Sequence, residues 1–163
     1  MDKILRDGRE GKGLNERTLV FLKPEAVLRS LIGEIITRIE KRGLNLAAIK
    51  LIQLTTKQVG EIYEMHRGKD FYQPLIEHVT SGPVLAMVVE GPNAISVLRS
   101  MVGRTNPVEA QPGTIRGDYA LTTTKNIIHA ADSAENAERE IKIFFSPNEI
   151  LKYQKPTESK YLL

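Results

Sequence analysis

Residues 126–133 contain the side chain best suited to chemistry, His129. A neutral imidazole has a free ring nitrogen that can attack phosphorus, and an unperturbed pKa of about 6.5 leaves it mostly neutral near pH 7. Histidine can therefore act as a covalent nucleophile, which splits a difficult transfer into two easier steps. A helix is predicted to begin at Asp132 or Ser133 and to run to about Glu140. Because helix N-termini attract anions, a histidine just before this helix suits phosphate chemistry.

A basic loop precedes the histidine. Arg104, Thr105 and Arg116 lie between positions 103 and 117 among glycines and prolines, and Arg99 lies just upstream. Phosphoryl transfer needs positive donors in fixed positions around the β- and γ-phosphates. Basic loop residues are usually only solvated, however, and an isolated histidine can simply satisfy a hydrogen bond at a loop end. The sequence has no Walker motif and no kinase-type glycine-rich loop, so these residues alone leave both interpretations open.

Short apolar segments are predicted to form the scaffold that positions these residues. The predicted strands are residues 18–22, 46–54, 84–89 and 141–145. Apolar residues with helical spacing predict helices at 32–39, 59–66, 71–79 and 94–102, ahead of the helix that follows His129. This order of elements is typical of an α+β sandwich, in which helices pack on a small sheet.

The composition narrows the class of protein. The length of 163 residues fits one domain. Hydrophobic residues make up 41% of the sequence and charged residues 26%, which is ordinary for a globular protein. The absence of cysteine excludes disulfides, thiolate catalysis and Cys-based zinc sites. A net charge of +3 says little about nucleic acid. No apolar run approaches the roughly 20 residues of a membrane span, and residues 1–16 lack the apolar stretch of a signal peptide. We expect no membrane partner and a cytoplasmic location.

The chain shows no repeats and no internal domain boundary. We predict a polar N-terminal extension over residues 1–16, one domain over residues 17–145, and a C-terminal tail over residues 146–163 that wraps a surface of the domain.

Several ordered motifs resemble the nucleoside diphosphate kinase family across roughly residues 17–145. These motifs are residues 16–25, 33–36, 81–84, 105–107, 112–118 and 126–129. The resemblance implies a ferredoxin-like βαββαβ fold with an antiparallel four-stranded sheet, in agreement with the order of elements above. It also implies ping-pong chemistry, in which a nucleoside triphosphate phosphorylates a histidine and a nucleoside diphosphate then collects the phosphoryl group.

The resemblance assigns roles around the transferring phosphate. His129 matches the nucleophile, and Lys23 matches a strand-end lysine that reaches the phosphate and the sugar hydroxyl. The residues that match the family's phosphate-holding groups are Arg99, Thr105 and Arg116. These types suit the task, because lysine is a mobile point charge and arginine a fixed fork for phosphate oxygens. Without the resemblance, Lys23 reads equally well as an exposed strand end.

Four further residues match family positions around the base, the sugar and the imidazole. Asn126 matches the contact to the ribose 3′-hydroxyl, Tyr63 a tyrosine beside the histidine, and Glu140 the glutamate that fixes the imidazole. Phe71 matches the aromatic shelf under the base, where stacking accepts every base. Taken alone, Phe71 and Tyr63 read as core and Glu140 as a solvated helix residue. His66 and His78 have no supporting motif and are assigned to surface or core packing.

The expected cofactor is Mg²⁺, bound through the nucleotide phosphates and water rather than by a protein site, since no carboxylate cluster of ligand type is evident. The expected partners are nucleoside di- and triphosphates, with no specific nucleic acid. The family also forms homo-oligomers. Retention of the 105–107 loop with Pro107 favours a hexamer over a tetramer.

The sequence departs from the family pattern at three positions. Ala130 and Ala131 stand where the family usually has glycine and serine, and Thr123 stands where an apolar residue usually covers the base. Alanine would cost about 1 kcal/mol if position 130 needed a positive φ. The lost serine hydroxyl would leave Glu140 in search of another partner. We therefore expect a modest loss of preorganisation and a looser base site.

Two other functions are compatible with the same sequence. A catalytically weakened family member could act as a nucleotide-binding or regulatory protein, which Ala130 and Ala131 would explain. A nucleic-acid binding module would fit the fold and the pI of about 9.1, but the strands lack the exposed aromatic pair that stacks on bases. The enzyme is the favoured interpretation.

Overall fold

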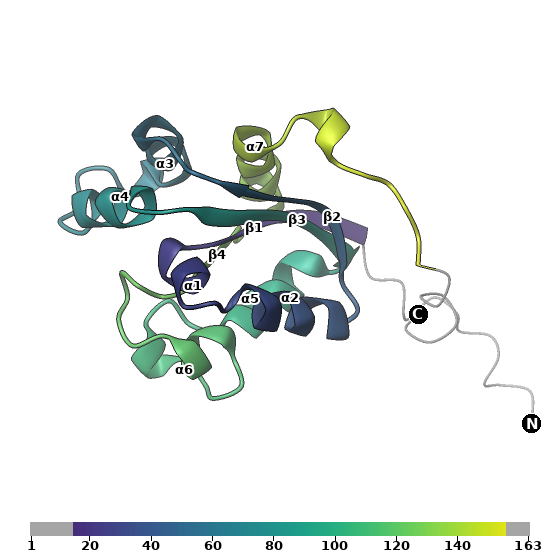
Figure 1. Ribbon diagram of the computed structural model, residues 1–163, viewed down its shortest axis with the longest axis horizontal. Helices are drawn as coiled ribbons and strands as arrows, with labels where there is room; N and C mark the ends of the chain where they lie inside the picture. The colour runs from purple at the N-terminus through teal and green to yellow at the C-terminus, as the bar shows by residue number, and fades with distance from the viewer. Residues whose placement is uncertain (1–14, 156–163) are drawn as a thin grey trace, which may run out of the picture.

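The computed structural model describes residues 15–155 and arranges them around one antiparallel sheet (Figure 1). The strands are β1 (Asn15–Leu22), β2 (Asn45–Ile52), β3 (Val84–Pro92) and β4 (Ile128–Ala130). The helices are α1 (Pro24–Leu28), α2 (Ile32–Lys41), α3 (Thr56–Ile62), α4 (Tyr72–Thr80), α5 (Ala94–Val102), α6 (Ile115–Tyr119) and α7 (Ala134–Phe144). Short 3-10 turns occur at η1 (Glu64–His66), η2 (Pro107–Glu109) and η3 (Pro147–Glu149).

The strand order β2-β3-β1-β4 confirms the predicted ferredoxin-like α+β fold. β1 pairs with β3 from Asn15↔Pro92 to Leu22↔Leu85, and its C-terminal half pairs with β4 on the other side. Both central strands are therefore covered by neighbours along their edges. Their buried sequences are nearly continuous apolar runs, as expected of strands covered on both faces.

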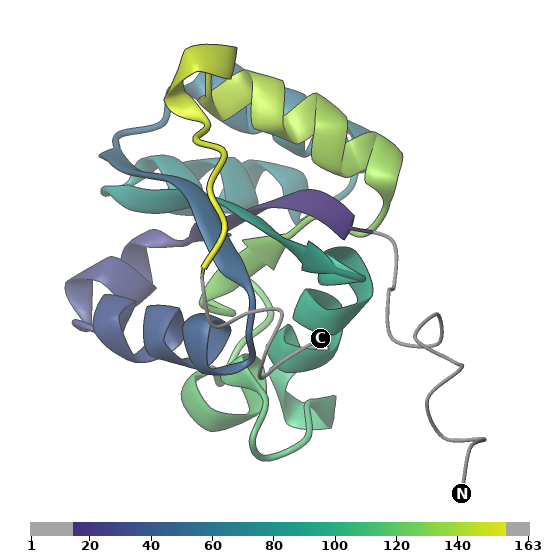
Figure 2. The same ribbon diagram turned by 90° about the vertical axis from the view of Figure 1, so that its right-hand side faces the viewer.

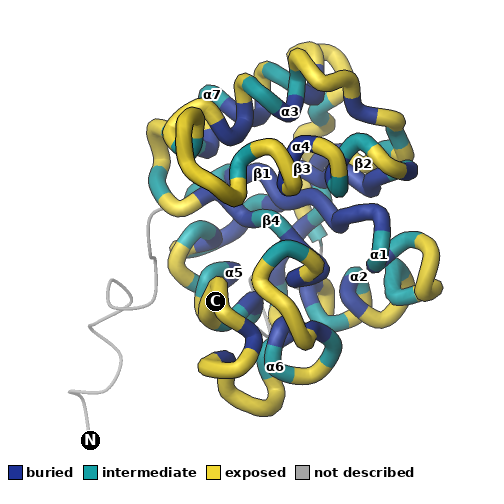
Figure 3. Tube along the Cα trace, turned by 90° about the vertical axis from the view of Figure 1, so that its left-hand side faces the viewer, coloured by how far each residue is buried: buried dark blue, intermediate teal, exposed yellow. Residues whose placement is uncertain are grey.

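Two apolar layers lie on opposite faces of the sheet. On one face, Leu19 and Phe21 of β1 pack with residues of α3, α4 and α7, and on the other Val20 and Leu22 pack with α2 and α5. The helices are arranged accordingly above and below the strands (Figures 1 and 2). Colouring by burial shows the same layering, with buried strands at the centre and exposed loops outside (Figure 3).

The prediction of a last strand at residues 141–145 was wrong, because residues 141–144 continue helix α7, which ends at Phe144. Ala137, Ile141 and Phe144 recur with helical spacing and are buried, and a short apolar run cannot be assigned by periodicity alone. The fourth strand is instead β4, which contains His129. Its three residues are too few to show an alternating pattern. The histidine thus lies within the sheet, four residues before Ser133, whose hydroxyl accepts from the N–H of Asn136 and caps α7.

The described part of the tail lies along the edge strand β2. The N–H of Leu151 donates to Ala47 O at 2.8 Å, and the Tyr153 hydroxyl donates to Leu46 O at 2.7 Å. Residues 1–14 of the predicted N-terminal extension and residues 156–163 of the tail fall outside the described range. Among residues 15–155, no helix has the length and apolar character needed to span a bilayer.

Candidate active site

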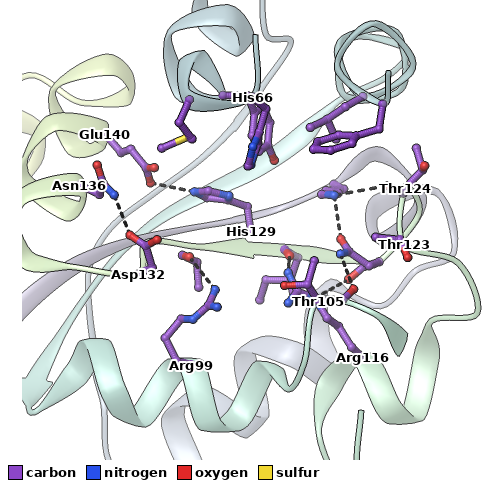
Figure 4. A pocket seen from close by; sticks show the side chains of 18 residues that line it. His66, Arg99, Thr105, Arg116, Thr123, Thr124, His129, Asp132, Asn136 and Glu140 are labelled. Atoms are coloured by element: carbon purple, nitrogen blue, oxygen red, sulfur yellow. Dashed lines mark hydrogen bonds and ion pairs between the residues drawn. The ribbon is translucent and has the colours of Figure 1, made fainter. Parts of the chain in front are cut away.

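One cavity of about 520 Å³ gathers the residues singled out above for chemistry, except Arg104, which does not line it and pairs with Glu109 (Figure 4). It lies where β4 and the end of β1 meet α3, α4, α5, α7 and the loop before β4. The residues in its wall that were predicted from the sequence are His129, Lys23, Glu140, Tyr63, Phe71, Arg99, Thr105, Arg116 and Asn126. Lys23 is more than 100 positions from Asn126, and the fold brings their side chains into direct contact.

The imidazole of His129 is held by a buried carboxylate. Its Nε2 lies 2.8 Å from Oε2 of Glu140, which is buried on α7 (Figure 4). Phe21 stacks against one side of the ring with centroids 4.8 Å apart, and the Tyr63 ring meets it edge-on at 5.5 Å. An ionised carboxylate only accepts hydrogen bonds. The proton therefore lies on Nε2, and Nδ1 keeps a free lone pair.

The two alanines that depart from the family pattern fit this arrangement. Ala130 pairs with Val20 as an ordinary strand residue and does not have a positive φ, so glycine is not required there. Glu140 faces the imidazole although position 131 offers no hydroxyl. Its Oε1 instead lies 3.7 Å from Nη2 of Arg139, and Nη1 of that arginine donates to Glu61 O at 2.7 Å. This guanidinium is the cation that Glu140 faces on the side away from His129, at a distance longer than a hydrogen bond.

A buried lysine reaches the cavity from the end of β1. The Lys23 ammonium donates to Asn126 Oδ1 at 2.7 Å and to Thr124 O at 3.4 Å. Burial is the main cause that lowers its pKa to about 8, helped by the charge of Arg116 and opposed by that of Glu25. A buried ammonium with one amide and one carbonyl as acceptors is poorly compensated. An anion in the cavity would be its natural counter-charge.

Arg116 both braces the backbone and faces the cavity. Three of its N–H groups donate to carbonyls, those of Asn126 at 3.2 Å, Gly103 at 3.2 Å and Ile128 at 2.7 Å. Burial lowers its pKa to about 10, and the nearby charge of Arg99 acts in the same direction. A guanidinium has five donors, so two remain for a ligand.

The remaining predicted phosphate contacts, Arg99 and Thr105, also line the cavity. Arg99, in α5, donates to Ala130 O at 3.3 Å, and the exposed Thr105 accepts from Asn126 Nδ2 through its carbonyl at 3.1 Å. Three cationic side chains, Lys23, Arg99 and Arg116, therefore surround the histidine in one cavity.

The backbone just before β4 is strained. Ile127 has a φ of 75°, and the N–H of Ile128 donates to Asn126 O at 2.9 Å, which closes a three-residue γ-turn. A β-branched residue rarely adopts positive φ, and such strain costs about 1–3 kcal/mol. This turn fixes the spacing between the Asn126 amide and the His129 ring.

The outer wall of the cavity is aromatic. Phe71 is 47% exposed, so part of its side chain is open to solvent. The ring of His66 meets Phe71 edge-on at 5.2 Å, and Lys69 Nζ lies 5.6 Å from the Phe71 centroid. His66, assigned above to surface or core packing, thus lines the cavity. Burial and the neighbouring Lys69 lower its pKa, so it favours the neutral form.

Sequence reasoning missed several polar groups of the wall. Asn136 donates to Asp132 Oδ1 at 2.7 Å at the start of α7, and the carbonyl of Thr124 accepts from Lys23. Thr123 also lines the cavity, as expected for a position near the base. The sequence offers Asp132 or Ser133 as the helix cap; Ser133 caps α7, and Asp132 lines the cavity. The only sequence feature that could have pointed to Asp132 was its acidic side chain close to His129.

The fold and the cavity define a phosphate-binding α+β protein with a histidine at the centre of its site. The family model described as Nucleoside diphosphate kinase matches residues 16–150, and the chain belongs to the nucleoside diphosphate kinase family. The chain is 59% identical to a nucleoside diphosphate kinase of Thermosipho melanesiensis over 138 residues, which cover 85% of this chain and 94% of that protein. It is also 59% identical to one of Methanocaldococcus jannaschii, over 84% of this chain and 98% of the relative.

Solved structures show the same likeness. A family protein from Babesia bovis has a TM-score of 0.85 at 42% identity, covering 88% of this chain and 97% of the other. A halophilic nucleoside diphosphate kinase from Halobacterium salinarum, solved in complex with CDP, has a TM-score of 0.86 at 39% identity, covering 89% and 97%.

Proposed function

We propose that the protein transfers the γ-phosphoryl group of a nucleoside triphosphate to a nucleoside diphosphate, with His129 as the phosphorylated intermediate. The observation that carries this proposal is the hydrogen bond between His129 Nε2 and Glu140 in a cavity lined by Lys23, Arg99 and Arg116. It supplies a nucleophile of defined tautomer next to three cations. The activity is the one for which the family is named.

The reaction follows from the free lone pair on Nδ1. In the first half, Nδ1 attacks the γ-phosphorus, the bond from phosphorus to the bridging oxygen breaks, and the nucleoside diphosphate leaves. The imidazole gains positive charge, which the Glu140 carboxylate stabilises through Nε2–H. In the second half, a β-phosphate oxygen of another diphosphate attacks the phosphorus. The P–N bond then breaks and its electron pair returns to Nδ1.

The cations and hydroxyls of the cavity stabilise the transferring group. Lys23, Arg99 and Arg116 balance the charge on the phosphate oxygens, and Thr105 offers a hydroxyl donor. The Tyr63 hydroxyl is buried and has no hydrogen-bond partner within the described part of the chain. Burial, and then the charge of Glu140, raises its pKa, so it stays protonated and able to donate. We assign it to an oxygen of the transferring phosphoryl group.

The nucleoside is proposed to lie between the cavity and its rim. The exposed side chain of Phe71 forms the shelf for the base, and Asn126, held by Lys23, contacts the ribose 3′-hydroxyl. Stacking on a π-face accepts any base. Thr123, where the family usually has an apolar residue, leaves the opposite side of the base less covered. The Halobacterium salinarum relative was solved in complex with CDP, which supports nucleotide binding by this chain.

Mg²⁺ is proposed to arrive with the nucleotide. Among residues 15–155, no group of three potential ligands from His, Cys, Asp and Glu is placed to hold a metal ion. Mg²⁺ prefers phosphate oxygens and retains several waters. Asp132 at the rim is the carboxylate left to approach these waters, since Glu140 is engaged with His129. The ion neutralises charge on the phosphates when bound.

The decisive experiment for this function uses the unmodified protein. After incubation with Mg²⁺ and γ-labelled ATP, we expect an acid-labile, base-stable label on the protein, which then passes to GDP on a chase. Acid-lability with base-stability is the behaviour of a phosphohistidine. Label that forms and does not transfer would contradict the second half of the cycle. Absence of label from folded protein that still binds ADP would favour the nucleotide-binding or regulatory alternative.

We further propose a homo-oligomer, with a hexamer favoured over a tetramer, supported by the retained loop at residues 105–107. Val108, next to this loop, is 84% exposed in the single chain, as a contact residue would be before assembly. Size-exclusion chromatography with light scattering is expected to give about six chain masses of 18.3 kDa. A stable monomer at micromolar concentration would refute the assembly. The cytoplasmic location stays a prediction.

A further inference from the structure

The strained turn before β4 is held through both the C=O and the N–H of its central residue, Ile127. The carbonyl of Ile127 accepts from the Lys23 N–H at 2.9 Å, and its N–H donates to Oε1 of Glu25 at 2.8 Å. Ile127 itself is completely buried. A β-branched residue leaves positive φ unless its surroundings prevent it. The Glu25 carboxylate is the group that accepts the hydrogen bond from the Ile127 N–H.

Glu25 is in turn held by a second helix. Its other oxygen, Oε2, lies 2.6 Å from Nε2 of His78 in α4, and both side chains are almost buried, at 11% and 12% exposure. Burial alone would raise the pKa of Glu25, but the hydrogen bonds from His78 and from Ile127 outweigh it and lower that pKa. The carboxylate is therefore ionised near neutral pH. Each of its oxygens has a separate donor.

We propose that Glu25 and His78 are positioning residues for phosphoryl transfer: Glu25 clamps the Ile127 N–H and keeps the strained turn closed, and His78 orients the Glu25 carboxylate. The turn sets the distance between the Asn126 amide, which holds Lys23, and the His129 ring. Relaxation of the turn would shift the nucleophile relative to the lysine without removing any group that touches the nucleotide. This inference rests on the proposed function.

The test compares two substitutions of Glu25 that both remove its charge. Glu25→Met is similar in length and has no oxygen acceptor, whereas Glu25→Gln keeps a carbonyl oxygen for the Ile127 N–H. Both remove the charge that acts on Lys23, so they differ in the hydrogen bonds that position 25 can make to the Ile127 N–H and to His78. We expect the single-turnover rate of His129 phosphorylation at saturating Mg-ATP to fall about 10- to 100-fold in Glu25→Met, since small misplacements cost that much. Glu25→Gln is expected to recover most of this loss.

His78→Phe keeps the ring and removes the donor. It is expected to slow phosphorylation about 3- to 10-fold, and the double variant Glu25→Met/His78→Phe to be no slower than Glu25→Met, because residues acting through one another are not additive. Glu77→Met changes the exposed neighbour of His78 and serves as the matched control, with an unchanged rate. Circular dichroism and thermal unfolding restrict the comparison to variants that fold.

A spectroscopic signal separates failure of the clamp from failure of the proposed function. The amide proton of Ile127 is expected to resonate far downfield in the wild type and in Glu25→Gln, and to move upfield in Glu25→Met. An unlabelled wild-type protein would sink the proposed function, while this resonance would still decide whether the clamp exists. A wild-type rate in Glu25→Met, or an equal loss in Glu25→Met and Glu25→Gln, would overturn the inference.

Discussion

Replacing His129 with glutamine is expected to abolish phosphoryl transfer while leaving nucleotide binding nearly intact. The label from γ-labelled ATP should disappear, and steady-state turnover should fall by about 10⁴-fold or more, as when other covalent nucleophiles are removed. The affinity for ADP should change by less than about 3-fold, because the side chains assigned to phosphate, ribose and base all remain. Rapid-quench labelling and isothermal calorimetry measure the two quantities.

Glutamine is chosen over alanine because of Glu140. That carboxylate is buried, and its close hydrogen-bond donor is His129 Nε2. Alanine would leave it with only the more distant Arg139, at a cost of about 1–3 kcal/mol for a buried group without a partner. An amide side chain at position 129 can still donate. Residual labelling in a folded His129→Gln protein would assign the covalent step to another residue.

The sheet and most helices could be predicted because their periodic apolar patterns agree with how they pack. Residues 84–89 read as a buried strand, and they form the N-terminal part of β3, which has a paired strand on each edge. The 32–39 helix likewise matches α2, whose buried residues are Ile35 and Ile39. Local pattern and tertiary environment point to the same structure in such elements, so the sequence suffices.

The last strand and its neighbouring turn could not be predicted, because tertiary contacts decide them. β4 has three residues, and its pairing with β1 becomes visible only when distant segments meet. Ile127 at positive φ contradicts its own backbone preference and is maintained by Glu25 and Lys23, each about 100 positions away. Sequence reasoning correctly fails at strained positions of this kind, which concentrate at functional sites.

The candidate site itself was predicted through the family motifs and not through spacing alone. Lys23, Tyr63, Arg99 and Glu140 come from four different elements, and nothing local says that they share a cavity. The modest loss of preorganisation expected from the departures at positions 130 and 131 stays a prediction, because their effect depends on tertiary contacts. The ordinary strand backbone at Ala130 and the Arg139 guanidinium 3.7 Å from Glu140 Oε1 are features that only the folded chain shows.

Replacing Lys23 with methionine is expected to slow His129 phosphorylation by about 10²- to 10³-fold, the usual effect of removing one charged donor from a transition state. Methionine fills similar space, so the cavity keeps its shape while the buried charge and the donor to Asn126 are lost. Lys125→Met is the matched control, because Lys125 is an exposed lysine two positions from Ile127 and does not line the cavity. Its rate should stay within about 3-fold of the wild type.

Lys23→Met should also remove two pH trends of opposite sign, one in the free energy of unfolding and one in the affinity for ADP. The pKa of Lys23 is lowered to about 8 in the folded protein, against 10.5 for an ordinary lysine. Between these values the unfolded chain binds more protons than the folded one, so the contribution of Lys23 to the free energy of unfolding rises with pH. A bound phosphate favours the ammonium form, so affinity for ADP should weaken as pH rises above about 8.

If Lys23 served only to stabilise the fold, the affinity for ADP would not change with pH as the lysine loses its proton. Its burial would be offset by protein partners, and ligand affinity would not depend on its proton. In Lys23→Met, compared with the wild type between pH 8 and 10, both the rise in the free energy of unfolding and the loss of ADP affinity should flatten together. Denaturant titrations at several pH values measure the free energy of unfolding, and calorimetry at the same pH values measures the affinity for ADP. If the affinity profile of Lys23→Met matched that of the wild type, the ammonium would not be the counter-charge of the phosphate.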